Sequence, residues 1–168
     1  MYVLDTNVLL SLQNHYFADV FVGLWIEINS LIEDNMLISI KEVQREVTSK
    51  EHKQFWDKIN ENHDYKFYKE LDNGEIEEWF KIEELDIYHK IIIRNKKDKN
   101  EEWSLQKEWS QGEAIADPLL ICHGLKHNST VVTTESPKKQ YNIPHVCKKL
   151  SINCIGIREF FKENNLKF

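Results

Sequence analysis

The stretch Tyr2-Val3-Leu4-Asp5-Thr6-Asn7 joins three β-prone residues directly to three polar ones. Short apolar runs of this kind are typical of strands buried within a sheet. The abrupt change at Asp5 predicts that the strand ends there in a polar loop. An acid in this position is a candidate for a functional site, and an aspartate that closes a turn is the alternative explanation.

Three further apolar or β-branched runs predict strands, and they lie near residues 36–39, 130–134 and 152–155. Helical patterns separate them, over about 18–33, 39–49, 118–127 and 157–163. Strands that are apolar throughout are typical of parallel sheets covered on both faces. The alternation therefore predicts an α/β fold, a three-layer α/β/α sandwich around a central, mainly parallel sheet.

Length and composition favour a single domain over residues 1–168. The chain is 41% hydrophobic and 11% aromatic, which is enough for one core but short for two. The strongly charged segment over about 50–111 is expected to be a helical insertion. Apolar runs are too short for a membrane span and no leader pattern opens the chain, so a cytoplasmic protein is expected. The three cysteines form no CxxC pair and are expected to be buried thiols.

The net charge of -6 bears on nucleic-acid binding. Proteins that bind nucleic acid by bulk electrostatics carry a basic surface, so this charge argues against that class. It leaves open a nuclease whose bound metal ions supply positive charge locally. The tryptophans of the middle segment either stack on RNA bases or belong to the core. They are Trp56, Trp79, Trp103 and Trp109.

The segment Ser39-Ile40-Lys41-Glu42 fits a capping box, with Ser39 as N-cap and Glu42 at the third helical position. It predicts a helix that continues to about Ser49. Glu46 lies four residues after Glu42 on the same helix face. Because capping occupies Glu42, Glu46 is the better candidate for a site residue, and a solvated glutamate paired with Lys50 is the alternative.

Two more acids lie next to predicted elements. Asp117 immediately precedes Pro118, which suits the first position of a helix, so an N-cap explains Asp117 as well as a site does. Glu135 directly follows a predicted strand and caps no helix that the pattern shows. Carboxylates from separate elements are the ligands that hard divalent cations prefer, and such cations activate water and neutralise a phosphoryl group. The candidate Mg²⁺ or Mn²⁺ ligands and catalytic residues are Asp5, Glu46, Asp117 and Glu135.

Supporting residues lie close to these acids in the sequence. Asn7 follows Asp5 by two residues and is expected to orient Asp5 or a metal-bound water. Glu113 lies one helical turn before Asp117 and is an accessory acid. His123 and His127 have the spacing of a helical metal pair, but the His-Glu-x-x-His pattern is absent, so two ordinary helix-end histidines are favoured.

Four motifs follow one another along the chain. They are Val3-Leu4-Asp5-Thr6-Asn7, then Ser39 to Glu46, then Ala116-Asp117-Pro118-Leu119-Leu120-Ile121-Cys122, and then Val131-Val132-Thr133-Thr134-Glu135. In this order they resemble the PIN-domain family, and most of all its bacterial toxin-type members. The resemblance implies an α/β/α sandwich whose acids bind Mg²⁺ or Mn²⁺ for RNA cleavage. By motif, Asp5, Glu46, Asp117 and Glu135 match the first to fourth acids, and Thr133 matches the hydroxyl residue that precedes the fourth.

The resemblance implies a hydrolase, an endoribonuclease that forms the toxin component of a toxin–antitoxin system. Its expected partners are RNA and a protein antitoxin, and a homodimer is left open. The chain departs from the family pattern at Pro118 and Glu135 and in the long insertion. These departures leave two alternatives to the ribonuclease open: a DNA- or structure-specific nuclease, and an interaction module whose catalytic site has decayed. A phosphatase with Asp5 as nucleophile is disfavoured, because the second aspartate it requires is replaced by Asn7.

Overall fold

A five-stranded sheet organises the chain, with the strand order β3-β2-β1-β4-β5 and every neighbouring pair parallel. The strands are β1 (Tyr2–Leu4), β2 (Leu37–Ile40), β3 (Tyr68–Lys69), β4 (Thr130–Thr133) and β5 (Cys154–Gly156). The computed structural model describes residues 1–63, 66–72, 82, 85, 116–139 and 142–166. Within these ranges the expected α/β/α sandwich and its four expected strands are confirmed.

Strand β1 is central, and the strands that follow it in the chain are added first on one side of it and then on the other. From β1 the order runs to β2 and β3 on one side and to β4 and β5 on the other. Such a reversal leaves a crevice at the carboxyl ends of the central strands, where ligands bind in open α/β sheets. Val3, Leu4, Val131 and Val132 are fully buried, as continuous apolar strands require.

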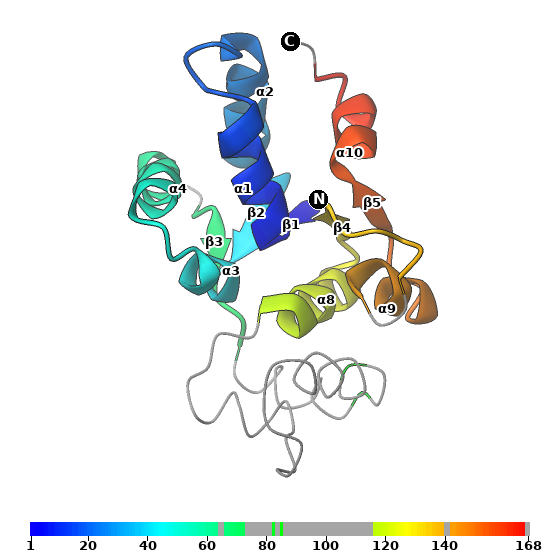
Figure 1. Ribbon diagram of the computed structural model, residues 1–168. Helices are drawn as coiled ribbons and strands as arrows, with labels where there is room; N and C mark the ends of the chain where they lie inside the picture. Colours follow the sequence, from blue (N-terminus) through cyan, green and yellow to red (C-terminus); the bar gives the residue numbers. More distant parts are fainter. Residues whose placement is uncertain (64–65, 73–81, 83–84, 86–115, 140–141, 167–168) are drawn as a thin grey trace.

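Helices cover both faces of this sheet (Figure 1). The described helices are α1 (Thr6–His15), α2 (Val22–Glu33), α3 (Lys41–Glu46), α4 (Lys50–Asn62), α8 (Ala116–His127), α9 (Ile143–Lys149) and α10 (Ile157–Glu163). On one face, Gly124 of α8 lies against Val131. On the other, the ring of Phe160 in α10 meets that of Tyr2 edge-on, with centroids 5.1 Å apart. In Figure 1, α8 and α9 lie on the opposite side of the sheet from α1, α2 and α10.

Two helices were not predicted, and one begins later than expected. A polar loop was expected after Asp5, but α1 begins at once, at Thr6. No helix was expected between the strands near 130–134 and 152–155, but α9 begins there, at Ile143. The helix expected from Ala18 begins at Val22, because a turn occupies the preceding residues, with Phe21 N–H donating to Phe17 O at 2.8 Å. The start of α9 did carry a signal in the sequence, because Asn142 is its N-cap and Pro144 lies in its first turn.

The predicted capping box is wrong. Ser39 belongs to β2, and its hydroxyl donates to Leu4 O on the neighbouring strand at 2.8 Å. Helix α3 has Ile40 at its N-cap position and ends at Glu46 rather than at Ser49. Glu42 is buried in the first turn, with Arg45 3.5 Å away. The buried hydroxyl of Ser39 satisfies a cross-strand carbonyl, which leaves it unavailable to a helix.

Helix α8 begins before the predicted point. It is already formed at Ala116, so Asp117 lies in its first described turn and is not the N-cap ahead of Pro118. At the other end, Asn128 has a φ of 49°, so the helix ends in the left-handed conformation.

An aromatic cluster fills the core between α2, α4 and β3. Trp56 is fully buried and stacks on Phe67, with ring centroids 5.4 Å apart. The rings of Phe55 and Trp25 also lie near it, with centroids at 5.4 Å and 5.8 Å. Trp56 is therefore a core residue and does not offer its ring to RNA. The expectations for Trp79, Trp103, Trp109 and Glu113 lie outside the described residues.

Helix α4 agrees with the helical insertion expected from residue 50, whereas β3 departs from it. A two-residue strand carries too little pattern to be distinguished from its surroundings. Among the helices in the described ranges, none has the length and apolar character needed to cross a membrane.

Substitution of Gly124 tests the contact between α8 and the sheet. A Cβ atom there would lie 2.7 Å from Cγ2 of Val131 and 3.2 Å from Cγ2 of Ile152, so Gly124→Ala must displace buried side chains. We expect the free energy of unfolding to fall by about 1 to 3 kcal/mol in urea denaturation. Gly23→Ala, on an exposed position of α2, is the control and should be neutral or slightly stabilising. Equal stability of the two variants would contradict this packing.

Candidate metal centre

Asp5 occupies the carboxyl end of the central strand and is 1% exposed. Its backbone N–H donates to Val132 O on β4 at 3.0 Å, which continues the sheet by one residue. Its carbonyl oxygen accepts from the N–H groups of Val8 and Leu9 in the first turns of α1. The strand and the helix thus fix the backbone of Asp5 from both sides, and its side chain caps no N–H of α1.

Thr133, the last residue of β4, links two of the acids. Its hydroxyl donates to Oδ2 of Asp5 at 2.8 Å and accepts from the backbone N–H of Glu135 at 3.1 Å. The β1–β4 register pairs Leu4 with Val132, so Asp5 and Thr133 follow side by side in the next row. The predicted supporting role of Thr133 therefore has a direct contact with Asp5.

Glu46 ends α3 and is held by two other helices. The hydroxyl of Thr6 on α1 donates to its Oε2 at 2.6 Å. The backbone N–H of Ala116 on α8 donates to its Oε1 at 3.2 Å. The alternative of a surface pair with Lys50 is thus replaced by contacts that join α1, α3 and α8. Sequence reasoning missed Thr6, although its position directly after Asp5 was a signal.

Glu135 begins the connection after β4 and reaches the start of α9. Its Oε2 accepts from the backbone N–H of Ile143 at 2.8 Å. The N-cap of this helix is Asn142, so Glu135 begins no helix of its own, but it binds the first residue of a helix that was not predicted. An acid at a helix N-terminus is favoured by the helix dipole. Asn142 caps the same helix, since its Oδ1 accepts from His145 N–H at 3.1 Å.

Charge interactions link Asp5 to each of the other three acids. The pKa of Asp5 rises from its ordinary 3.8 to about 7, first because of burial and next because of the negative charge of Asp117. The hydrogen bond from Thr133 opposes this rise, while the charges of Glu135 and Glu46 add to it. The pKa of Glu135 is also raised, chiefly by burial, and Asp117 contributes there too. Asp117 thus acts on both strand-end acids.

The donor set suits a hard divalent cation. Oδ1 of Asp5 is buried and has no hydrogen-bond partner, so it lacks the compensation that a buried carboxylate needs. Carboxylate oxygens are the ligands that Mg²⁺ and Mn²⁺ prefer. In the described part of the chain, however, no three His, Cys, Asp or Glu side chains are grouped as a ready metal site. Glu46 and Glu135 are instead bound to N–H and hydroxyl donors of the protein.

The remaining predicted candidates contribute less. Asn7 lies on the exposed side of the first turn of α1, and its proposed orienting role stays a prediction. The rings of His123 and His127 are 4.4 Å apart on α8. Burial, more than the neighbouring His127, lowers the pKa of His123 to about 4, so its ring is neutral at pH 7. No third ligand joins this pair among the described residues.

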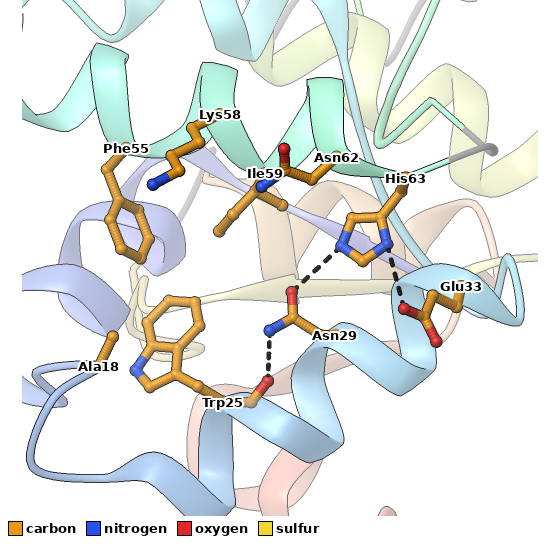
Figure 2. A pocket seen from close by; sticks show the side chains of 9 residues that line it. All are labelled: Ala18, Trp25, Asn29, Glu33, Phe55, Lys58, Ile59, Asn62 and His63. Carbon is orange, nitrogen blue, oxygen red and sulfur yellow. Dashed lines mark hydrogen bonds and ion pairs between the residues drawn. The ribbon is translucent and has the colours of Figure 1, made fainter.

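A cavity of about 470 Å³ lies between α2 and α4, and none of the four acids lines it. Figure 2 shows its apolar wall of Trp25, Phe55 and Ile59. At its other end, His63 Nε2 lies 3.1 Å from Asn29 Oδ1, and Nδ1 lies 3.6 Å from Glu33 Oε1. Lys58, Glu33 and His63 line the cavity beside this apolar wall. Asp5 and Glu135, in contrast, have raised pKa values, and Asp5 interacts electrostatically with acids from separate parts of the chain. We therefore regard the acids as the candidate site.

The family described as Domain of unknown function (DUF4411) matches residues 2–168. The chain belongs to the DUF4411 family. No curated protein and no solved structure matches it. The DUF4411 match spans both the strands that carry Asp5 and Glu135 and the segment between Glu46 and Asp117.

The raised pKa of Asp5 predicts how stability depends on pH without metal. Between about pH 4 and 7 the folded protein keeps this proton while the unfolded chain loses it, so the free energy of unfolding falls as pH rises and levels off above 7. Asp5→Asn removes that loss and should be more stable at pH 8 by on the order of a few kcal/mol. Denaturation at several pH values checks this, with Asp19→Asn in an exposed turn as control. Parallel pH profiles of wild type and Asp5→Asn would contradict it.

Removal of the Thr133 hydroxyl tests the effect of its hydrogen bond on the pKa of Asp5. Thr133→Val eliminates the hydrogen bond that lowers the pKa of Asp5, so that pKa should rise above about 7. Thr133→Ser keeps a hydroxyl and should restore the wild-type titration. Carboxyl carbon NMR of the metal-free protein measures the midpoint. An unchanged midpoint in Thr133→Val would show that the contact has no effect on Asp5.

Proposed function

We propose that this DUF4411 protein is a metal-dependent endoribonuclease, which hydrolyses RNA phosphodiester bonds at Asp5, Glu46, Asp117 and Glu135. One observation supports this function above others. A buried aspartate at the switch point of a parallel sheet has an unpartnered oxygen, and three further acids from other elements raise its pKa. A protein that gathers buried negative charge in this way is stabilised by a cation at the same place.

The chemistry of the donor set fits Mg²⁺ or Mn²⁺. When bound, the ion would activate water and neutralise charge on the phosphoryl oxygens. Asp5 would supply its free Oδ1, with its orientation fixed by the Thr133 hydroxyl. Glu46 and Glu135 are positioned from the protein side, by Thr6 and Ala116 N–H and by Ile143 N–H. Asp117 brings a further carboxylate from the first described turn of α8.

The resemblance of the four motifs to PIN-domain ribonucleases supports RNA as the substrate. It also supports a role as the toxin component of a toxin–antitoxin pair, with a protein antitoxin as partner and the cytoplasm as the site of action. The free state of all three cysteines agrees with a reducing compartment. A homodimer and a DNA- or structure-specific activity stay open within the same proposal.

A second candidate is an interaction module on the same fold whose metal site has decayed. Two observations favour it: no ready metal-binding group occurs among the described residues, and protein donors already satisfy Glu46 and Glu135. Calorimetry with Mn²⁺ separates the two candidates. A nuclease binds the ion at this site and loses binding with Asp5→Asn, whereas a decayed module shows no binding in either protein.

Cleavage assays on matched variants test the nuclease function. Asp5→Asn and Asp117→Asn each remove one negative ligand without changing side-chain size. We expect RNA cleavage with Mn²⁺ to fall by more than the roughly 10- to 100-fold typical of outer-shell changes. Glu61→Gln, an exposed position on α4, carries the same chemical change and should keep full activity.

The same proteins are assayed on RNA and on single- and double-stranded DNA of equal sequence. Cleavage of DNA alone would redirect the substrate assignment. Wild-type activity in both Asp5→Asn and Asp117→Asn would refute the acid site. Induced expression in a bacterial host adds a test of the toxin role, because growth arrest by the wild type should be lost with Asp117→Asn.

A further inference from the structure

Two of the three cysteines meet between α9 and β5. Cys147 lies on α9 and is fully buried, while Cys154 begins β5 and is partly exposed. The chain returns from α9 to β5 close to Cys147, since Ile152 N–H donates to Cys147 O at 2.8 Å. The two thiols hydrogen-bond to each other, and neither is in a disulfide.

The sheet register places this pair on the face that carries the acids. Cys154 pairs with Val131, and partners in register point to the same face. Gly124 of α8 lies against Val131, so this is the face that α8 covers. Thr133 lies two residues after Val131 and therefore shares the face with its partner Asp5. In Figure 1, α9 lies beside α8 and close to the start of β5.

We propose that Cys147 and Cys154 form a redox-active pair, which a peroxide converts into an intramolecular disulfide beside the acid site. Cys154 is the attacking residue, because it is the partly exposed member of the pair and a second thiol lies next to it. Peroxide-sensitive cysteines have these properties: an accessible sulfur with thiolate character and a resolving cysteine within reach.

The electrostatics agree with this assignment. The hydrogen bond from Cys147 lowers the pKa of Cys154, although burial and the charges of Asp5 and Glu135 oppose that effect. The same hydrogen bond and burial raise the pKa of Cys147, which keeps its proton until it reacts. Cys122, which is 3% exposed on α8, has its pKa raised to about 12 by burial and serves as an internal control.

The reaction balances with hydrogen peroxide as the only oxidant. The Cys154 thiolate attacks one peroxide oxygen, the O–O bond breaks, and the departing hydroxide takes a proton to form water. The sulfur of Cys147 then attacks the sulfenic acid on Cys154, and its proton leaves with the hydroxyl group as a second water. Two thiols lose two hydrogen atoms, one S–S bond forms, and the peroxide is reduced to two waters.

Disulfide formation would reach the acid site through α9. A disulfide brings the two sulfurs to about 2.05 Å, closer than two hydrogen-bonded thiols, and joins α9 to β5 by a covalent bond. Helix α9 begins at Ile143, whose N–H holds Glu135. The expected effect on metal binding rests on the proposed function: the oxidised protein should bind Mn²⁺ about tenfold or more weakly than the reduced protein.

Peptide mapping after peroxide treatment of the full chain tests the disulfide. Trypsin cleaves after Lys148 and Lys149, between the two cysteines, so only a disulfide keeps their peptides joined. We expect a linked peptide pair without reductant, its separation by dithiothreitol, and a reduced Cys122. Oxidation of Cys122 at the same rate as Cys154, or two free thiols after treatment, would overturn the proposal.

Matched variants assign the roles of the two sulfurs. Cys147→Ala leaves no resolving thiol, so a sulfenic acid on Cys154 should be trapped by dimedone. Cys154→Ala should leave Cys147 reduced and unlabelled. Cys147 is buried, so Cys147→Ala is the variant at risk of misfolding. Cys154→Ala therefore tests the assignment independently. Oxidation of Cys147 in the Cys154→Ala protein would overturn the assigned order of the two cysteines.

Calorimetry with Mn²⁺ on the reduced and the oxidised wild type separates the two proposals. Weaker binding after oxidation supports the coupling, and equal binding overturns it. Absence of Mn²⁺ binding in the reduced protein counts against the metal-dependent function and leaves the disulfide result standing.

Discussion

The hydrogen bond from Thr133 to Asp5 spans 128 residues of sequence, and the parallel pairing of β1 with β4 makes it possible. Once these two strands pair, their carboxyl ends meet in one crevice, and the helices that leave them must begin there. Parallel strands present their ends at the same edge of the sheet, so polar residues at these ends are brought together regardless of their separation along the chain. The candidate site therefore depends on sheet topology before it depends on any helix.

The same arrangement has a cost in stability. A carboxylate that is 1% exposed and faces three other acids destabilises the folded state when it is ionised. The chain reduces this cost with local donors: Thr133 for Asp5, Thr6 and Ala116 N–H for Glu46, and Ile143 N–H for Glu135. Oδ1 of Asp5 is left without one. Charge concentrated in this way is typical of a site that selection keeps for function.

Structural and functional interpretations of these acids coexist. Glu46 joins α1, α3 and α8 through two hydrogen bonds, and Glu135 holds the first residue of α9. Each acid therefore positions an element while contributing charge to the field around Asp5. Substitution by the amide keeps the side-chain shape and one acceptor oxygen while it removes the charge. This suffices for Glu135, whereas Glu46 accepts with both of its oxygens. Aspartate or glutamate changed to alanine would remove both and would confuse folding with chemistry.

Local sequence patterns predicted four of the five strands and placed Asp5 and Glu135 at strand ends. The apolar runs before Asp5 and Glu135 are local patterns, and a strand buried on both faces must carry them. Tertiary structure decided what those patterns do not encode. The hydroxyl of Ser39 donates to a carbonyl on β1 and therefore caps no helix. Glu135 accepts from Ile143 N–H only because α9 packs beside β5. The pKa of Asp5 depends on burial and on the charges of three acids from other parts of the chain. The Cys147–Cys154 contact depends on the return of the chain into the sheet. Each of these is a contact between distant or differently oriented elements, and no periodicity in one segment records it.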